Sequence, residues 1–188
     1  MTGGETPPVT RYAWPSSQEP EAVVDFLTPT RGAGTQATLA MGGIVAQQLR
    51  TLDVLVEDPL VLSIKEKGDE EAFVGSVRVP RVGAFLLQKV QTLPSRRASK
   101  RDKDLFYIFD LADESRGLEQ KTGADVEQLR ARLGARKLKE AASSLRRDCG
   151  EPASPGVARV LRQIPPEHRP LREYVAETFN RLADTFDG

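Results

Sequence analysis

The sequence predicts an α+β protein, in which a small mixed β-sheet is followed by a helical C-terminal region. Three short apolar runs, at 52–56, 60–64 and 72–79, are typical of strands, whereas apolar residues beyond Pro80 recur with helical spacing. Strands therefore come first and helices after, an order that argues against a doubly wound sheet. We expect a flexible arm over 1–20, a core over 21–115 and a helical region over 116–188.

The N-terminal half supplies the predicted strands. The stretch "EAVVDFLT" is typical of a short strand that Pro29 closes, and the small residues of "TRGAGTQATLAMGG" predict a loop after it. The glycines and alanine at 32, 34 and 37 match a dinucleotide-binding spacing, but without crossover helices around them we interpret them as loop residues. "KEKGDEE", with Gly68, predicts a turn that joins the last two strands in a hairpin.

The C-terminal half supplies the predicted helices. The first runs from Pro80 to Leu93, before Pro94, and the second has Ser99 and Asp102 at capping-box spacing. Two shorter amphipathic helices follow, broken near Gly134. "EPASPG" then predicts a linker, and the terminal helix is expected to carry the chain's one histidine, at 168, in its first turn.

Composition excludes several functions. Lys plus Arg and Asp plus Glu both total 27, so any anion-binding surface must be local. With one cysteine, Cys149, and one histidine, the chain has neither an internal disulfide nor a Cys/His zinc site. No signal peptide or membrane-spanning run is visible, so we expect a cytoplasmic protein without a membrane partner.

Lys89 is the most unusual residue of the first predicted helix. It falls within an arc of apolar side chains formed by Val82, Phe85, Leu86, Val90 and Leu93. A lysine in such an arc extends to solvent, pairs with a buried carboxylate or holds an anionic ligand. The helix pattern alone leaves these three alternatives open.

A basic connection follows Lys89, and its cations are Arg96, Arg97, Lys100, Arg101 and Lys103. It ends at the start of the next predicted helix, where free N–H groups also favour anions, so it predicts a phosphate site. The usual alternative is a solvated loop. Asp104, near the edge of the next apolar stripe, is an alternative partner for Lys89, and the spacing fits a salt bridge as well as a ligand site.

Asp25 is a lone carboxylate among the apolar residues of the first predicted strand. One interpretation places it on the wet face of a half-buried sheet. The other makes it a metal-binding acid, because strand-borne carboxylates hold Mg²⁺ against substrate phosphates.

The order of "VVDFLTP", "LRTLDVLV", "VRVPRVGAFLLQKV", an arginine at 96 or 97 and "KRDKDLFYIFDLAD" resembles the C-terminal part of a family of bacterial nucleotidyltransferase-fold proteins. It is similar to the toxin-type nucleotidyltransferases of abortive-infection systems, and the resemblance covers about Ala22 to Asp113. It implies an incomplete nucleotidyltransferase-like fold, with Asp25, Lys89 and Asp104 as catalytic residues. Asp25 would bind Mg²⁺, and the nucleotide-binding residues would be Lys89, Arg96, Arg97 and Lys103.

The chain departs from that family at its start, because "MTGGETPP" contains no Gly-Ser turn followed by an Asp-x-Asp pair on the first strands. We therefore expect weak or no activity from the chain alone. It would be a truncated product, a half that pairs with a separately encoded N-terminal half, or a degenerate homologue. The implied partners are a nucleoside triphosphate and an RNA acceptor.

An alternative function rests on the basic helices over 124–147. Two short helices around Gly134 resemble a helix-turn-helix, and several arginines and lysines line them. This pattern predicts a nucleic-acid-binding or protein-interaction module.

Overall fold

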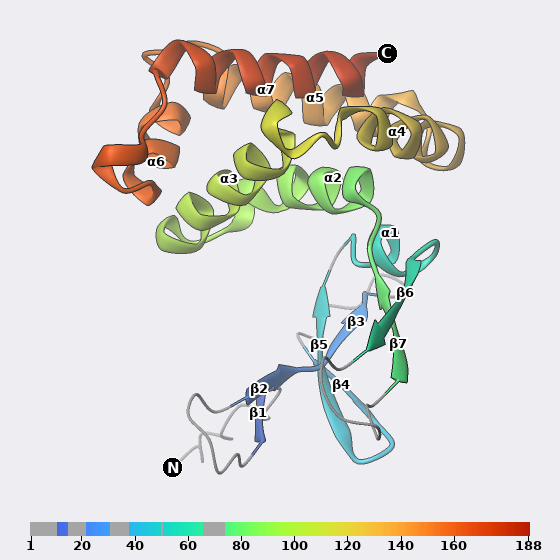
Figure 1. Cartoon of the computed structure of the whole chain (residues 1–188). Helices are drawn as coiled ribbons and strands as arrows, with labels where there is room; N and C mark the ends of the chain where they lie inside the picture. The colour runs from blue at the N-terminus through green and yellow to red at the C-terminus, as the bar shows by residue number, and fades with distance from the viewer. Residues whose placement is uncertain (1–10, 15–21, 31–37, 50, 66–73) are drawn as a thin grey trace, which may run out of the picture. The chain divides into compact units, whose positions relative to one another are not determined.

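The computed structural model describes residues 11–14, 22–30, 38–49, 51–65 and 74–188. The chain divides into two compact units, Met1–Asp53 and Val54–Gly188. Figure 1 shows strands in the first unit and a strand hairpin followed by helices in the second. None of the helices in the described ranges is both long and apolar enough to cross a membrane.

The first unit contains five short strands. β1 (Arg11–Trp14) pairs antiparallel with β2 (Ala22–Asp25). β3 (Leu27–Pro29), β4 (Thr38–Met41) and β5 (Ile44–Leu49) form a sheet in the order β3-β5-β4, in which β5 runs parallel to β3 and antiparallel to β4. The predicted mixed sheet is therefore confirmed.

Glycine makes the tight connection between β4 and β5. Gly42 and Gly43 have φ of 56° and 79°, a conformation that side chains with a Cβ rarely adopt, and they join the two strands as a two-residue hairpin loop. The loop prediction for 30–43 is therefore wrong at 38–41, and the strand at 44–49 had no predicted counterpart. Residues 11–14 form a strand within the stretch predicted as an arm. The glycines at 32 and 34, and "MTGGETPP", lie outside the described residues.

α1 (Asp53–Val56) lies at the boundary between the two units, where the sequence predicted a strand over 52–56. That prediction is wrong because a run of five residues is too short for its apolar pattern to distinguish a strand from one helical turn. β6 (Leu60–Lys65) and β7 (Val74–Val79) form the predicted antiparallel hairpin, with Leu60 opposite Val79. The predicted turn around Gly68 lies outside the described residues.

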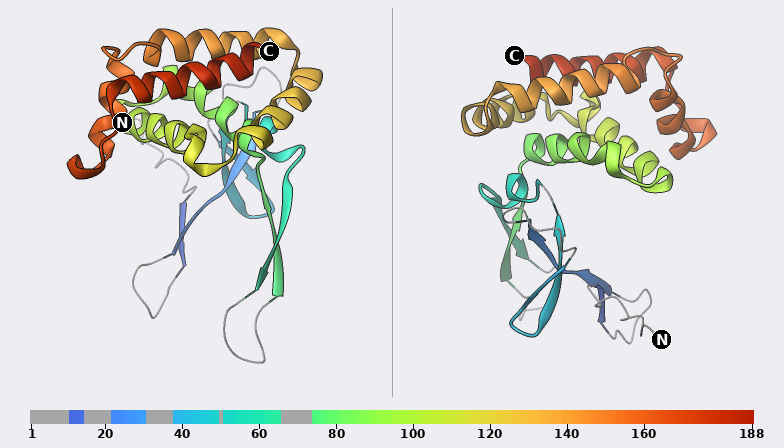
Figure 2. Two further views of the ribbon diagram at one scale, coloured as in Figure 1. Left: turned by 45° about the horizontal axis from the view of Figure 1, so that its top comes forward. Right: turned by 180° about the vertical axis from the view of Figure 1, so that it is seen from behind.

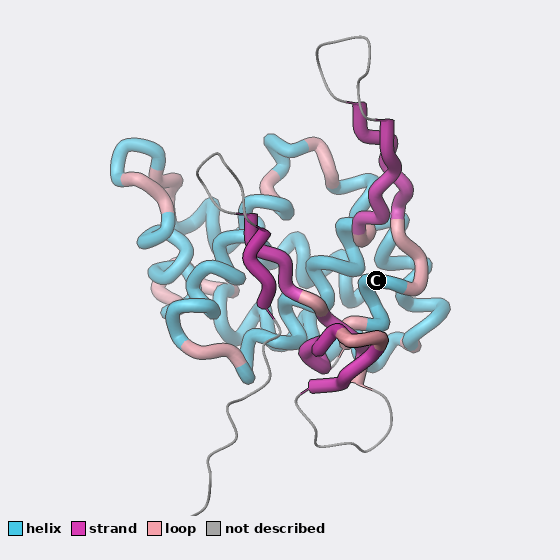
Figure 3. Tube along the Cα trace, turned by 90° about the horizontal axis from the view of Figure 1, so that it is seen from below, coloured by secondary structure: helices cyan, strands magenta, loops and turns pink. Residues whose placement is uncertain are grey.

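The remainder of the second unit is helical, and its elements are α2 (Val82–Thr92), η1 (Leu93–Ser95), α3 (Ala98–Ala112), η2 (Glu114–Arg116), α4 (Glu119–Leu133), α5 (Ala135–Cys149), α6 (Pro155–Gln163), η3 (Pro166–His168) and α7 (Arg172–Asp187). α5 and α7 lie side by side, α3 packs on α6, and α2 packs on α4 (Figures 1 and 2). Figure 3 shows the same helices as one body with the β6–β7 hairpin extending from it. The core includes Leu86, Leu87, Ile108, Leu138, Phe179 and Phe186.

Helix boundaries differ from the predictions in three places. Ser99 and Asp102 form no capping box, because α3 begins at Ala98 and its N-cap, Arg97, makes no side-chain hydrogen bond. α6 begins at Pro155, inside the predicted linker, since proline suits the first turn of a helix. His168 is exposed, but it lies in η3, ahead of α7.

The predicted helix break near Gly134 is confirmed, and the helix that follows it ends at a buried cysteine. Gly134 separates α4 from α5 with a φ of 80°, which explains the break in the amphipathic pattern. Cys149 is the last residue of α5, and its burial raises the pKa of the thiol to about 12. A thiol with that pKa is protonated near neutral pH and unreactive.

Candidate functional site

Lys89 pairs with a buried carboxylate. Its Nζ donates to Oδ1 of Asp104 across 2.6 Å, from α2 to α3. The side chains of Lys89 and Asp104 are 15% and 7% exposed, and Arg96 places its Nε 3.0 Å from the second carboxylate oxygen. Of the three alternatives for Lys89, the structure shows the pairing, in a cluster of two cations and one carboxylate.

The connection between α2 and α3 holds this cluster together. Pro94 lies in η1, directly after α2, so α3 starts within a few residues of the end of α2. The Arg101 guanidinium donates to the main-chain oxygens of Leu93, Pro94 and Arg96. Because these bonds fix the connection, they keep Arg96 near Asp104, and Arg101 itself is a structural residue.

The contact between Arg96 and Asp104 is electrostatic rather than a well-aligned hydrogen bond. Arg96 Nε and Asp104 Oδ2 lie within ion-pair distance, yet each is buried without a hydrogen-bond partner in the described part of the chain. A small movement of the guanidinium would align the two atoms. The cluster therefore retains a donor and an acceptor that no other described group uses.

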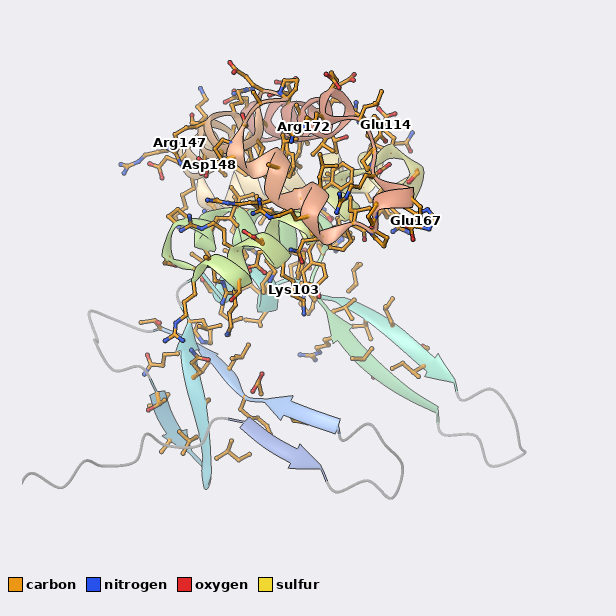
Figure 4. All side chains as sticks on the ribbon, turned by 90° about the vertical axis from the view of Figure 1, so that its left-hand side faces the viewer. Lys103, Glu114, Arg147, Asp148, Glu167 and Arg172 are labelled. Atoms are coloured by element: carbon orange, nitrogen blue, oxygen red, sulfur yellow. The ribbon has the colours of Figure 1, made fainter. Side chains whose placement is uncertain are left out.

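Two aromatic rings lie beside the Lys89 ammonium. Lys89 Nζ is 5.3 Å from the ring centre of Phe85 and 5.8 Å from that of Tyr107. Lys103 Nζ lies 5.4 Å from the Tyr107 ring, and Figure 4 labels Lys103 on α3. Cations within about 6 Å of a ring centre are attracted to its face, so Tyr107 lies close to two positive charges.

The basic connection divides into residues with different roles. Arg97, Lys100 and Lys103 are exposed, and they form no ion pair with the described residues. Asp102 does not neutralise them, because its carboxylate lies 3.6 Å and 3.2 Å from the nearest guanidinium nitrogens of Arg159 and Arg162 on α6. The predicted nucleotide-binding residues thus comprise a half-buried pair, Lys89 and Arg96, and an exposed pair, Arg97 and Lys103.

Asp25 is an exposed residue at the end of β2, and its register partner is Arg11 on β1. It belongs to the first unit, whereas Lys89 and Asp104 belong to the second. A common site that includes Asp25 therefore stays a prediction.

The described residues do not form a magnesium site. Within those ranges, no group of three or more His, Cys, Asp or Glu residues converges in a way that would hold a metal ion. Asp104 already has two cations beside it, and Asp25 supplies one carboxylate. This donor set does not fit Mg²⁺, which prefers several oxygen ligands.

A second polar site, which the sequence analysis missed, lies where α2 begins. A cavity of about 380 Å³ is lined by Arg81, Asp125, Arg132 and acidic residues 57 and 58, among others. Asp125 Oδ2 accepts a hydrogen bond of 3.1 Å from the Gly83 N–H, and Arg81 bridges Asp58 and Asp125. Asp125 therefore caps α2 from α4. No local signal near Pro80 reveals a cap 42 residues away in sequence.

The cations of the helices over 124–147 are mostly neutralised. Arg146 pairs with Asp184 and Asp187, and Arg136 pairs with Glu140. Arg130 donates to the main-chain oxygens of the last residues of α7. Arg146 and Arg130 thus link α5 and α4 to α7, whereas Arg136 pairs within α5 and stays exposed. The inter-helix pairing of Arg146 and Arg130 does not favour the alternative function.

Comparison with known proteins identifies the class. A sequence model of a family described as nucleotidyltransferase matches residues 6–128. The match contains β1 to α3 and most of α4, and with them Asp25 and the Lys89–Asp104–Arg96 cluster. The chain belongs to this nucleotidyltransferase family, whose substrates are nucleotides. Searches of curated proteins and of solved structures found no match.

Proposed function

We propose that the chain contributes a nucleotide-binding site to nucleotidyl transfer, and that Lys89 and Arg96 contact the triphosphate. In this reaction the oxygen of an acceptor hydroxyl attacks the α-phosphorus and gives up its proton. The bond between the α-phosphorus and the oxygen that bridges it to the β-phosphorus breaks, and diphosphate leaves. Charge develops on the phosphate oxygens, so cations held in place before the reaction stabilise the transition state. The cluster of Lys89, Arg96 and Asp104 supports the proposal because two cations share one carboxylate.

In the proposed site, Asp104 is a positioning residue. Its carboxylate holds both the Lys89 ammonium and the Arg96 side chain, so it sets their separation before a nucleotide arrives. Because the buried Arg96 Nε lies against Asp104, the terminal nitrogens of the Arg96 guanidinium are the donors proposed for a phosphate oxygen. The ring of Tyr107 lies beside Lys89 and offers a face to the base or ribose.

Asp25 enters the proposal as a carboxylate for a metal ion that the described residues do not hold by themselves. The printed sequence has no Asp-x-Asp pair on its first strands. Transfer that lacks those acids loses most of its electrostatic stabilisation. We therefore propose weak or no transfer by this chain alone, and activity when a partner or a longer product supplies the missing acids. RNA is the proposed acceptor, as in the toxin-type enzymes that the sequence resembles.

Nucleotide binding tests the site directly. Labelled ATP, CTP, GTP and UTP are titrated, with and without Mg²⁺, against the wild type, Lys89→Ala and the matched control Lys121→Ala, which removes an exposed lysine of α4. We expect Lys89→Ala to weaken binding and Lys121→Ala to leave it unchanged. Equal binding by all three, or no binding by the wild type, would refute the proposed site.

A transfer assay tests the proposed activity. The same nucleotides are incubated with total RNA and either this chain or a version extended by the upstream reading frame. Incorporation by the extended form alone supports the requirement for missing acids. Incorporation by the short chain contradicts that requirement, and its absence from both contradicts nucleotidyl transfer.

A further inference from the structure

A groove at the C-terminal end of the second unit lies outside the family match, which ends at residue 128. It has a volume of about 550 Å³ and is lined by α6 and by the segment that enters α7. Its lining contains the three arginines Arg162, Arg169 and Arg172 and one glutamate, Glu173. Because Arg162 pairs with Asp102 of α3, the positive charge that the groove offers a ligand comes from Arg169 and Arg172. Figure 4 labels Arg172 on this part of the helical unit. The groove is a cationic site that shares no residue with the cluster of Lys89, Arg96 and Asp104.

Hydrogen bonds hold Arg169 and Arg172 in place without neutralising them, whereas Arg162 pairs with Asp102 of α3. Arg169 Nε donates to the Ile164 oxygen at 2.9 Å, and Arg172 Nη1 donates to the Pro152 oxygen at 3.2 Å. Neither guanidinium forms an ion pair with the described residues. Since a guanidinium has five N–H donors, each retains several for a ligand.

Apolar side chains complete the walls of the groove. Leu161, Pro170 and Leu171 line it together with the arginines, and Leu171 is 75% exposed, an unusual position for a leucine in a helical unit with a well-packed core. A free phosphate would make no favourable contact with these apolar walls. A ligand that carries both phosphates and flat apolar faces uses the whole groove.

We propose that this groove binds single-stranded nucleic acid, with Arg169 and Arg172 on successive phosphates and Leu171 against a base. Single strands combine an anionic backbone with unstacked bases, and proteins bind them through positively charged grooves that follow the backbone. The lining of this groove contains no aromatic residue, so the contact with a base comes from an aliphatic side chain. Duplexes bury their bases, so they offer the groove only phosphates. The binding needs neither a nucleoside triphosphate nor the Lys89 site.

The test measures anisotropy of short fluorescent single strands of RNA and of DNA, titrated with the full chain at several salt concentrations. Arg169→Ala combined with Arg172→Ala removes two phosphate contacts. The slope of log affinity against log salt should fall by about 1.4, since each contact on a single strand contributes about 0.7, and affinity near 0.1 M salt should fall roughly 25-fold. Leu171→Ala should weaken binding and leave the salt slope unchanged.

Matched variants distinguish the groove from general charge. Lys137→Ala combined with Lys139→Ala removes two exposed cations from α5 and should leave affinity and slope nearly unchanged. Arg169→Lys combined with Arg172→Lys should retain most of the slope. Both sets are checked for folding by circular dichroism, and a correctly folded alanine pair that binds like the wild type overturns the proposal.

The remaining outcomes are also decisive. Equal loss in the α5 control, displacement of the strand by inorganic phosphate alone, or tighter binding of an acidic peptide than of RNA or DNA would each overturn the assignment. Tighter binding of RNA than of DNA would identify RNA as the ligand, and the reverse result would identify DNA. Lys89→Ala should bind the strands like the wild type, so failure of the nucleotide site and failure of the groove are separately visible.

Discussion

The pairing of Lys89 with Asp104 leads to an ordered set of stability changes. Asp104→Asn removes the one negative charge between Lys89 and Arg96 and leaves two cations without a carboxylate. Breaking a fully buried pair in this way costs about 3–5 kcal/mol. Because Lys89 is 15% exposed and can turn toward water, we expect a cost below that range, about 2–3 kcal/mol.

Removing the lysine of the pair should lower the free energy of unfolding by less than removing the aspartate. Lys89→Met keeps the apolar stem beside Phe85 and leaves Asp104 with Arg96 as its partner, so we expect about 1–2 kcal/mol. In the double variant, Lys89→Met with Asp104→Asn, neither charge of the pair remains. Its cost should fall below the sum of the single changes by about 1–3 kcal/mol, the coupling typical of residues in contact.

Urea unfolding followed by far-ultraviolet circular dichroism measures these differences, since the helices are in the second unit with the pair. Thermal unfolding should show shifts of about 2–4 °C for each kcal/mol. Additive costs in the double variant, or a Lys89→Met change as costly as Asp104→Asn, would show that the two charges do not depend on each other. The inference that Asp104 positions Lys89 would then be wrong.

Three further predictions concern other parts of the second unit. Gly83→Ala places a Cβ 2.7 Å from the Cβ of Asp125, so it should cost about 1–3 kcal/mol in urea unfolding, and an unchanged midpoint would contradict the close packing. Cys149 should resist alkylation at mildly alkaline pH until the protein unfolds, because burial raises its pKa to about 12, and fast labelling of the native chain would contradict this. Burial acts to raise the pKa of Asp113, but hydrogen bonds, including one from Tyr174, outweigh burial and lower that pKa. The ionised Asp113 therefore stabilises the fold at pH values above its unfolded pKa. This stabilisation is lost as the pH falls through the lower pKa of the folded state. Tyr174→Phe should therefore cost about 1 kcal/mol at neutral pH and reduce the acid-dependent loss in urea midpoints measured across pH, whereas an unchanged pH profile would contradict it.

The sequence predicted those parts of the fold that depend on local patterns. Pro94 and Gly134 mark real helix boundaries. The apolar arc predicted for α2 matches its buried face only in part, because Leu86 and Val90 are buried but Phe85 is half-buried. Residues 52–56 formed a helix instead of a strand, because so short an apolar run has no distinguishing period. The cap of α2 by Asp125 depends on packing between distant segments, which no local pattern encodes.

The candidate site shows the same difference between features that follow from local pattern and features that depend on packing. Lys89 was recognisable because a charge inside an apolar arc needs a partner, and Asp104 was one of the partners that the spacing allowed. Arg101 was grouped with the phosphate-binding cations, since sequence shows its charge but not the main-chain oxygens that occupy it. The groove at α6 and α7 went unnoticed because Arg162, Arg169 and Arg172 are scattered among prolines and become a cluster only through packing.

The tripeptide from Asp102 to Asp104 links these features through helix geometry. Residues two apart on a helix point to nearly opposite sides, so the two carboxylates serve different neighbours. Asp104 faces α2 and pairs with Lys89, while Asp102 faces α6 and pairs with Arg162, a residue of the arginine-lined groove. Lys103 between them is exposed beside Tyr107. Asp102 thus neutralises part of the positive charge of the groove, and Asp104 neutralises part of the positive charge of the Lys89 cluster. The positive charge left at each of the two proposed anion sites therefore depends on a different carboxylate of the same helix.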